Sequence, residues 1–411
     1  MKAKLDAGYT CVTTASWNVL FRSSGAAVLF ISLLSLPAWG DSQKTQLGTL
    51  LVMGDSLSAG FQNFSLYDTA QNAGFAALIA DQAGVSLPLP LISVPGIPGM
   101  LSIDASGTIS RSAATGSREN PTVQAYNISV PGFTLANALA YQVNTAQPIT
   151  NAIDALALSI LAEPGSASSP PCGVVASTPT GVLTLSEVAC ALKLQPQTIV
   201  ASIGNNDALQ TLIFGTAPTD ATVFAAEYAG LLGALSATKA KIVVSNVPDV
   251  TVLPFLVPAP AFQAMCHFLP AGVTNADYLV PDITSTTATT LSLCSDYAVR
   301  PAALIAQAKS AVASYNTTIK ALAGKFGVTV VDVNGLLEDL AAHGYKVRGE
   351  TLTTAYLGGL LSLDGLHPTN TGYAILANLF IDTMNEKLGT HIKDVNVVQV
   401  EKADPLVFGK H

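Results

Sequence analysis

Short apolar runs alternate along this chain with segments of helical periodicity. The runs are rich in β-branched residues and end at turn residues, as strands do: Thr49–Met53, Val123–Val130, Thr198–Ile203, Ile242–Asn246 and Val328–Val331. The helix-like segments are Ala73–Gln82, Leu135–Asn144, Val223–Ala237, Ala302–Ala323 and Thr371–Lys387. This alternation predicts an α/β fold in which helices cover both faces of a central parallel five-stranded sheet.

Three segments exceed what such a sandwich needs, and we expect them to be loop insertions. They lie near residues 85–121, 160–194 and 251–300 and are rich in Pro, Gly, Ser and Thr. The first and third are unusually apolar for loops, as Leu87–Ile92 and Leu253–Pro258 illustrate. Loops of this kind pack either against the core of the domain or against an apolar substrate, and the sequence leaves both interpretations open.

The first 40 residues have the features of an export signal. Gly25–Ala38 is an uncharged apolar stretch that follows Arg22, and Ala38 and Gly40 are small residues of the kind that a signal peptidase reads. We expect residues 1–40 to be a signal peptide that is cleaved near Gly40, so that the protein is periplasmic or extracellular. An uncleaved anchor is the alternative, although the stretch is shorter than the roughly 20 apolar residues of a spanning helix.

The cysteines agree with export. Outside the leader they form two pairs that are local in sequence, Cys172 with Cys190 and Cys266 with Cys294. We favour disulfides with this pairing, because each would staple one insertion, and four reduced thiols are the alternative. No C-x-x-C or H-E-x-x-H spacing occurs, so we expect no metal site. The 19 Lys and Arg against 27 Asp and Glu, a formal net charge of -8, argue against a nucleic-acid partner.

Polar motifs follow several of the expected strands, where the ligand crevice of an open α/β sheet lies. They are Gly54-Asp55-Ser56, Pro131-Gly132, Gly204-Asn205-Asn206-Asp207 and, near the end of the chain, Asp364-Gly365-Leu366-His367. A carboxylate three residues before a histidine can hold one imidazole nitrogen while the other nitrogen faces a hydroxyl. Each motif alone is also compatible with an ordinary turn, helix cap or surface pair. Their combination favours a nucleophilic serine.

In this order, the motifs resemble those of the GDSL or SGNH hydrolase superfamily. The resemblance covers residues 50 to 385 and includes a weaker match at Asn246–Val250. It implies a flavodoxin-like three-layer α/β/α fold for residues 41–394, followed by a C-terminal tail, residues 395–411, whose valines suggest an edge strand. It also implies serine ester hydrolysis without a cofactor.

The resemblance carries residue roles with it. Ser56 would be the nucleophile, His367 the general base and Asp364 the group that orients the imidazole. The N–H groups of Ser56 and Gly132 and the amide of Asn206 would form the oxyanion hole. Asp55 and Asp207 would brace the nucleophile turn and the Asn206 loop.

The substrate is less constrained than the reaction. The apolar insertions favour a medium or long acyl chain, and hence a secreted, monomeric esterase or lipase that hydrolyses small-molecule or lipid esters and touches lipid surfaces transiently. A carbohydrate O-acetyl esterase is the first alternative, but it would need aromatic platforms, and the 2 Trp residues lie in the leader and at the cleavage site. The second is a secreted binding protein that keeps the fold without activity.

Overall fold

A parallel sheet forms the centre of the protein. The computed structural model describes residues 46–163, 171–282 and 292–407, and the expected signal peptide lies outside them. Within these residues the central sheet has four strands in the order β1-β7-β8-β12. They are β1 (Leu50–Gly54), β7 (Thr198–Ser202), β8 (Lys241–Ser245) and β12 (Thr329–Val331). Strands β1 and β7 are buried along their whole length, as apolar strands covered on both faces are.

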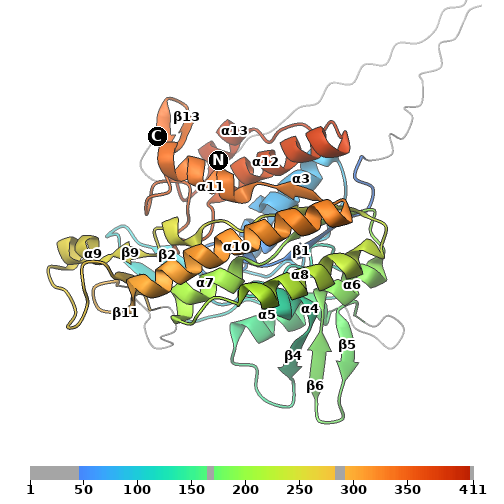
Figure 1. Ribbon diagram of the computed structural model, residues 1–411, viewed down its shortest axis with the longest axis horizontal. Coiled ribbons are helices and arrows are strands. Elements are labelled where there is room, and N and C mark those ends of the chain that lie inside the picture. The colour runs from blue at the N-terminus through green and yellow to red at the C-terminus, as the bar shows by residue number, and fades with distance from the viewer. Residues whose placement is uncertain (1–45, 164–170, 283–291, 408–411) are drawn as a thin grey trace, which may run out of the picture. The chain divides into compact units, whose positions relative to one another are not determined.

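Successive residues of β1 enter different hydrophobic clusters, which shows that the sheet is the middle of three layers. Leu51 and Met53 pack in the cluster that contains Phe224 of α8, whereas Leu50 and Val52 pack in the other. The first layer includes α4 (Leu135–Leu139), α5 (Ala152–Leu161), α6 (Glu187–Leu194), α7 (Asn205–Phe214), α8 (Ala221–Ser236) and α10 (Ala302–Phe326). The second includes α3 (Phe75–Ala83), α11 (Val333–His343), α12 (Asn370–Leu388) and α13 (Val397–Ala403), which lie together in Figure 1. The predicted α/β class with helices on both faces is confirmed.

The prediction of a fifth strand at Val123–Val130 was wrong. The segment does run beside β1, where Val52 donates to Tyr126 O and accepts from Ile128 N, but it forms only an isolated parallel bridge between Val52 and Asn127. The Val130 N–H still donates to the Gly54 carbonyl, but the Gly54 N–H donates to Glu187 at 2.9 Å instead of to this segment, so the ladder is incomplete.

The insertions contain small elements of their own. The first carries the hairpin of β2 (Leu101–Ile103) and β3 (Ile109–Arg111), and the second carries β5 (Val174–Ser177) and β6 (Val182–Leu185), which β4 (Tyr141–Asn144) joins in one sheet. The third carries η1 (Val250–Val252), β9 (Val257–Pro258), α9 (Ala259–Cys266), β10 (Tyr278–Pro281) and β11 (Tyr297–Arg300). The remaining short elements are α1 (Ser56–Ala59), α2 (Asp68–Ala73), β13 (Tyr345–Val347) and β14 (Glu350–Leu352).

Two further elements differ from expectation. The helix expected over Leu135–Asn144 ends at Leu139, because the residues after it pair with β6 instead. The C-terminal tail forms the helix α13 rather than an edge strand. Asp404 there accepts hydrogen bonds from the backbone N–H and the hydroxyl of Thr371, both at 2.7 Å, and so fastens the tail to the first turn of α12.

Both predicted disulfides are present, Cys172 with Cys190 and Cys266 with Cys294. The first joins the segment before β5 to α6 within the second insertion, and the second joins α9 to the segment before β11. Among the helices of the described residues, none is both long and apolar enough to cross a membrane.

Candidate active site

Ser56 stands at the first position of α1, directly after the turn that ends β1. Gly54 has a φ of +142° in this turn, and a Cβ there would lie 1.9 Å from the carbonyl oxygen of Ser202 on β7, so only glycine fits. Asp55 caps α1 by accepting from the Leu57 N–H at 3.1 Å. Because Ser56 begins the helix, its own N–H has no acceptor within the helix and is available to a ligand.

Ser56, His367 and Asp364 form a hydrogen-bonded row. The Nε2 atom of His367 lies 2.8 Å from Ser56 Oγ, and its Nδ1 atom lies 2.9 Å from Asp364 Oδ2. All three residues are buried, with Ser56 8% and His367 7% exposed. The structure therefore brings together the three residues that the sequence singles out, although His367 is 311 positions from Ser56.

Asp364 is held on all sides. Its Oδ1 accepts from the N–H groups of Leu366 and His367, and its Oδ2 accepts from the Phe64 N–H as well as from the imidazole. Burial alone would raise the pKa of this carboxyl, but His367 and the backbone donors together hold it below its usual value. An ionised Asp364 keeps the Nδ1–H of His367 in place and leaves Nε2 free to accept the Ser56 proton.

Gly132 lies in the loop that follows the segment Val123–Val130, and the side chain of Asn206 contacts the same loop. Gly132 has a φ of +88°, and a Cβ there would lie 2.8 Å from Ile153 Cδ1. The Asn206 amide donates one N–H to the carbonyl of the next residue, Phe133, at 2.8 Å. Because a side-chain amide has two N–H groups, one remains for a ligand. Asn205, the first residue of α7, ties the start of that helix to the nucleophile turn by donating to Asp55 Oδ1 at 3.0 Å.

Asp55 and Asp207 are buried carboxyls that hold the loops of the site. Asp207 accepts from the Leu135 N–H and from the Thr219 hydroxyl, which joins the start of α7 to the start of α4. Burial raises its pKa to about 6. Burial also raises the pKa of Asp55 to about 7, against the hydrogen bonds from Asn205 and Leu57, and its Oδ2 is buried without a partner.

Glu187 is the site residue that sequence reasoning missed. It belongs to α6 in the second insertion, it is 0% exposed, and its two oxygens accept from Gly54 N at 2.9 Å and from Val130 N at 3.0 Å. Burial raises its pKa well above the usual range of a glutamate. One carboxylate thus bridges the Ser56 turn and the Gly132 loop. Its only sequence signal was a glutamate directly after Ser186, which reads as an ordinary helix start.

No group of three or more His, Cys, Asp or Glu side chains that could hold a metal ion occurs in the part of the chain that the structure describes.

Comparison with known proteins gives one strong match and several distant ones. The family model for GDSL-like lipase/acylhydrolase matches residues 50–380. The solved structure of TesA is 14% identical, with 82% of this chain and 98% of that chain covered and a TM-score of 0.35. A lipase/acylhydrolase from Enterococcus faecalis is 12% identical (84% and 100% covered, TM-score 0.36), and a catalytic mutant of an acetylxylan esterase from Geobacillus stearothermophilus is 11% identical (82% and 93% covered, TM-score 0.35). No curated protein matches the chain.

Proposed function

Because the chain belongs to the GDSL-like lipase/acylhydrolase family, we propose that it hydrolyses carboxylic esters with Ser56 as the nucleophile. His367 acts as general base and then general acid, and Asp364 orients and electrostatically supports the imidazole. The single observation that carries this proposal is the buried row of hydrogen bonds, 2.8 Å from Ser56 Oγ to Nε2 and 2.9 Å from Nδ1 to Asp364.

The reaction runs in two halves. Ser56 Oγ attacks the ester carbonyl carbon while its proton passes to His367 Nε2, and the carbonyl π electrons move to the oxygen. The resulting oxyanion lies among the N–H groups of Ser56, Gly132 and Asn206. When the carbon–alkoxy bond breaks, the imidazolium returns the proton to the departing alcohol. Water then attacks the acyl-serine by the same route and releases the carboxylic acid and free Ser56.

A serine substitution with covalent labelling tests the proposal. Ser56→Ala should abolish turnover of p-nitrophenyl esters and labelling by a fluorophosphonate, whereas Ser236→Ala, at an exposed position on α8, should change neither. If Ser56→Ala leaves turnover unchanged, Ser56 is not the nucleophile and the proposal is wrong. If the wild type neither turns over nor labels, the proposal is also wrong and a silent binding protein is the better interpretation.

We also propose that the protein acts outside the cytoplasm, after removal of residues 1–40. The two disulfides and the family membership support export, because disulfides persist in oxidising compartments. N-terminal sequencing of the protein recovered from a periplasmic or culture fraction should begin at or near Asp41. Recovery of the full-length chain only from the cytoplasm would contradict this.

A further inference from the structure

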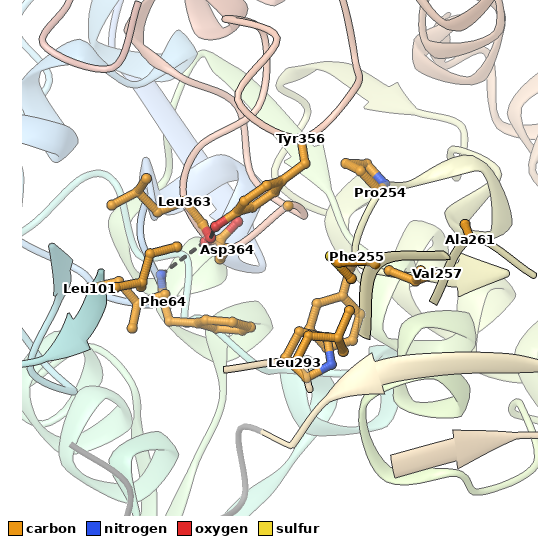
Figure 2. Close-up of a pocket in the computed structure, with 14 residues that line it drawn as sticks. Phe64, Leu101, Pro254, Phe255, Val257, Ala261, Leu293, Tyr356, Leu363 and Asp364 are labelled. Carbon is orange, nitrogen blue, oxygen red and sulfur yellow. Dashed lines mark hydrogen bonds between the residues drawn. The ribbon is translucent and has the colours of Figure 1, made fainter. Parts of the chain in front are cut away.

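A cavity of about 400 Å³ opens beside Asp364, between the triad loop and the two apolar insertions (Figure 2). We infer that this cavity takes a long aliphatic chain of the ester substrate, which makes the protein selective for lipid-like esters. The inference rests on the proposed function, since it concerns the substrate of the same site.

Four separate parts of the chain build the walls, and the segment between α1 and α2 contributes Phe64. The first insertion contributes Leu101 and Ile109 from its hairpin, and the third contributes Phe255, Ala261 and Met265, among others. The loop before α12 contributes Tyr356 and the stretch from Leu363 to Gly365. The two insertions that were unusually apolar in sequence therefore face one shared cavity rather than only the core of the domain.

The polarity of the cavity favours a hydrocarbon chain over a sugar. Asp364 and Tyr356 have the only polar side chains among the residues that line it, all of them in the described part of the chain. Each oxygen of Asp364 already accepts two hydrogen bonds, and the Tyr356 hydroxyl donates to the Leu363 carbonyl at 3.1 Å. A sugar would leave its hydroxyls without side-chain partners here, whereas a hydrocarbon chain loses nothing by leaving water.

The cavity is close enough to the reacting atoms to hold a substrate chain. Asp364 forms part of its wall, and in Figure 2 this side chain lies between Phe64 and Tyr356. Only the imidazole of His367 separates Asp364 from Ser56 Oγ, through hydrogen bonds of 2.9 and 2.8 Å. Neither Ser56 nor His367 lines the cavity, so an aliphatic chain on an ester at Ser56 has to pass the imidazole to reach it, and only a chain of several methylenes is long enough.

The rim of the cavity exposes one apolar side chain and one aromatic ring. Met265 is 52% exposed and Tyr356 is 44% exposed, and both line the cavity. Their sequence neighbours Phe268 and Leu357 are also large apolar residues exposed to solvent. Met265 and the ring of Tyr356 give the cavity an exposed and largely apolar mouth, so we expect the aliphatic chain of the substrate to enter from a lipid aggregate.

Filling the cavity is the direct test. Ala261 is an exposed residue of α9 that lines the cavity, so Ala261→Trp adds bulk there without disturbing the core. Ala264→Trp is the matched control, because Ala264 is exposed on the same helix and does not line the cavity. If Ala261→Trp fails to fold, Met265→Gln at the exposed rim replaces it.

The readout is the ratio of kcat/KM for a long chain to that for a short one. It is measured with p-nitrophenyl octanoate against acetate for the acyl part, and with octyl acetate against ethyl acetate for the alcohol part. We expect the wild type to favour the long chain in at least one series, Ala261→Trp to lower that ratio by about tenfold or more, which is about 1.4 kcal/mol, and Ala264→Trp to leave it unchanged. Equal ratios in wild type and Ala261→Trp, or a wild type that prefers the short chain in both series, would overturn the inference.

Binding without turnover separates this inference from the proposed function. The Ser56→Ala protein should bind the fluorescent fatty acid cis-parinaric acid, and Ala261→Trp in that background should weaken the binding about tenfold or more. If binding behaves in this way while the wild type hydrolyses no ester, the cavity still holds an aliphatic chain and the proposed chemistry is what fails. If Ala261→Trp and Ala264→Trp bind the fatty acid equally, the cavity assignment fails.

Discussion

The carboxylate of Glu187 accepts a hydrogen bond from the backbone N–H of Gly54 at 2.9 Å, two residues before Ser56. Its other oxygen holds the N–H of Val130, two residues before Gly132. Glu187 therefore sets the distance between the nucleophile turn and a proposed donor of the oxyanion hole. A residue from an insertion, with no contact to the reacting atoms, thus acts as a positioning residue.

Glu187→Gln should lower kcat more than it changes KM. The glutamine keeps one acceptor oxygen but turns its NH₂ group toward a backbone N–H. If that is the Gly54 N–H, a buried donor loses its partner at a cost of about 1–3 kcal/mol, whereas the Val130 N–H also donates to the Gly54 carbonyl. Displacement of the turn should reduce kcat by about 10- to 100-fold. Glu386→Gln, on the exposed side of α12, is the control. A variant that is destabilised but keeps its kcat would show that Glu187 is structural only.

Asn206→Ala should reduce kcat by about 10²–10³, the usual effect of removing one oxyanion donor. The substitution also leaves the Phe133 carbonyl without its 2.8 Å partner, so unfolding by urea should be measured in parallel. A kcat close to that of the wild type in a folded protein would remove Asn206 from the oxyanion hole.

Hydrolysis should slow on acidification. A protonated imidazole at His367 cannot accept the Ser56 proton, so kcat/KM should fall as the pH is lowered. Initial rates with a p-nitrophenyl ester, followed through buffered steps, measure this. A rate that stays constant over the whole range would argue against a histidine base.

Asp55 should make the protein less stable as the pH rises. Its folded pKa is raised from 3.8 to about 7, chiefly by burial, so its stabilising contribution is complete below about pH 4 and is lost as the pH passes through about 7. Between these limits the free energy of unfolding of the wild type should fall by about 4 kcal/mol relative to that of Asp55→Asn. Urea unfolding of both proteins at several pH values measures the difference. Parallel curves would contradict the assignment.

Removal of the two disulfides should affect activity differently. They close loops between residues 18 and 28 positions apart, so each should stabilise the fold by about 3 kcal/mol. Replacing Cys172 and Cys190 by Ser should also lower kcat, because α6 carries Glu187, whereas replacing Cys266 and Cys294 should spare the hydrolysis of acetate esters. Urea unfolding, esterase assays and non-reduced peptide mapping check these outcomes. Equal kinetic effects of the two double variants would contradict the separation.

The sequence predicted those parts of the fold whose signal is local. Strands such as Thr198–Ser202 and helices such as Asn370–Leu388 lie within a residue or two of their predicted bounds, because their apolar periodicity and their ends are written in consecutive residues. The segment Val123–Val130 has the residue types of a strand, yet the Gly54 N–H of the neighbouring strand donates to the distant Glu187 carboxyl instead of pairing with it. Tertiary contacts of this kind have no local signal.

The residues of the site show the same difference between local sequence signals and tertiary contacts. Ser56, Asn206, Asp364 and His367 stand in short motifs whose residue types already indicate chemistry, and the structure brings Ser56, Asp364 and His367 into hydrogen-bonding distance. Glu187 was missed because one glutamate in an insertion resembles any helix start, and its meaning lies in two backbone N–H groups far away in sequence. The only sequence signal for the cavity was the apolar character of the insertions.

The disulfide between Cys266 and Cys294 ties α9, which carries Ala261 and Met265, to the segment with Leu293 on another side of the cavity. The disulfide thus joins two parts of the wall that we assign to the substrate chain. The residues assigned to the chemistry come instead from the strand ends and the loop before α12. We therefore expect substitutions in α9 and around Leu293 to change which chains are accepted while the hydrolytic residues stay as they are. This makes the segment between Thr251 and Arg300 the place to begin in redesigning its selectivity.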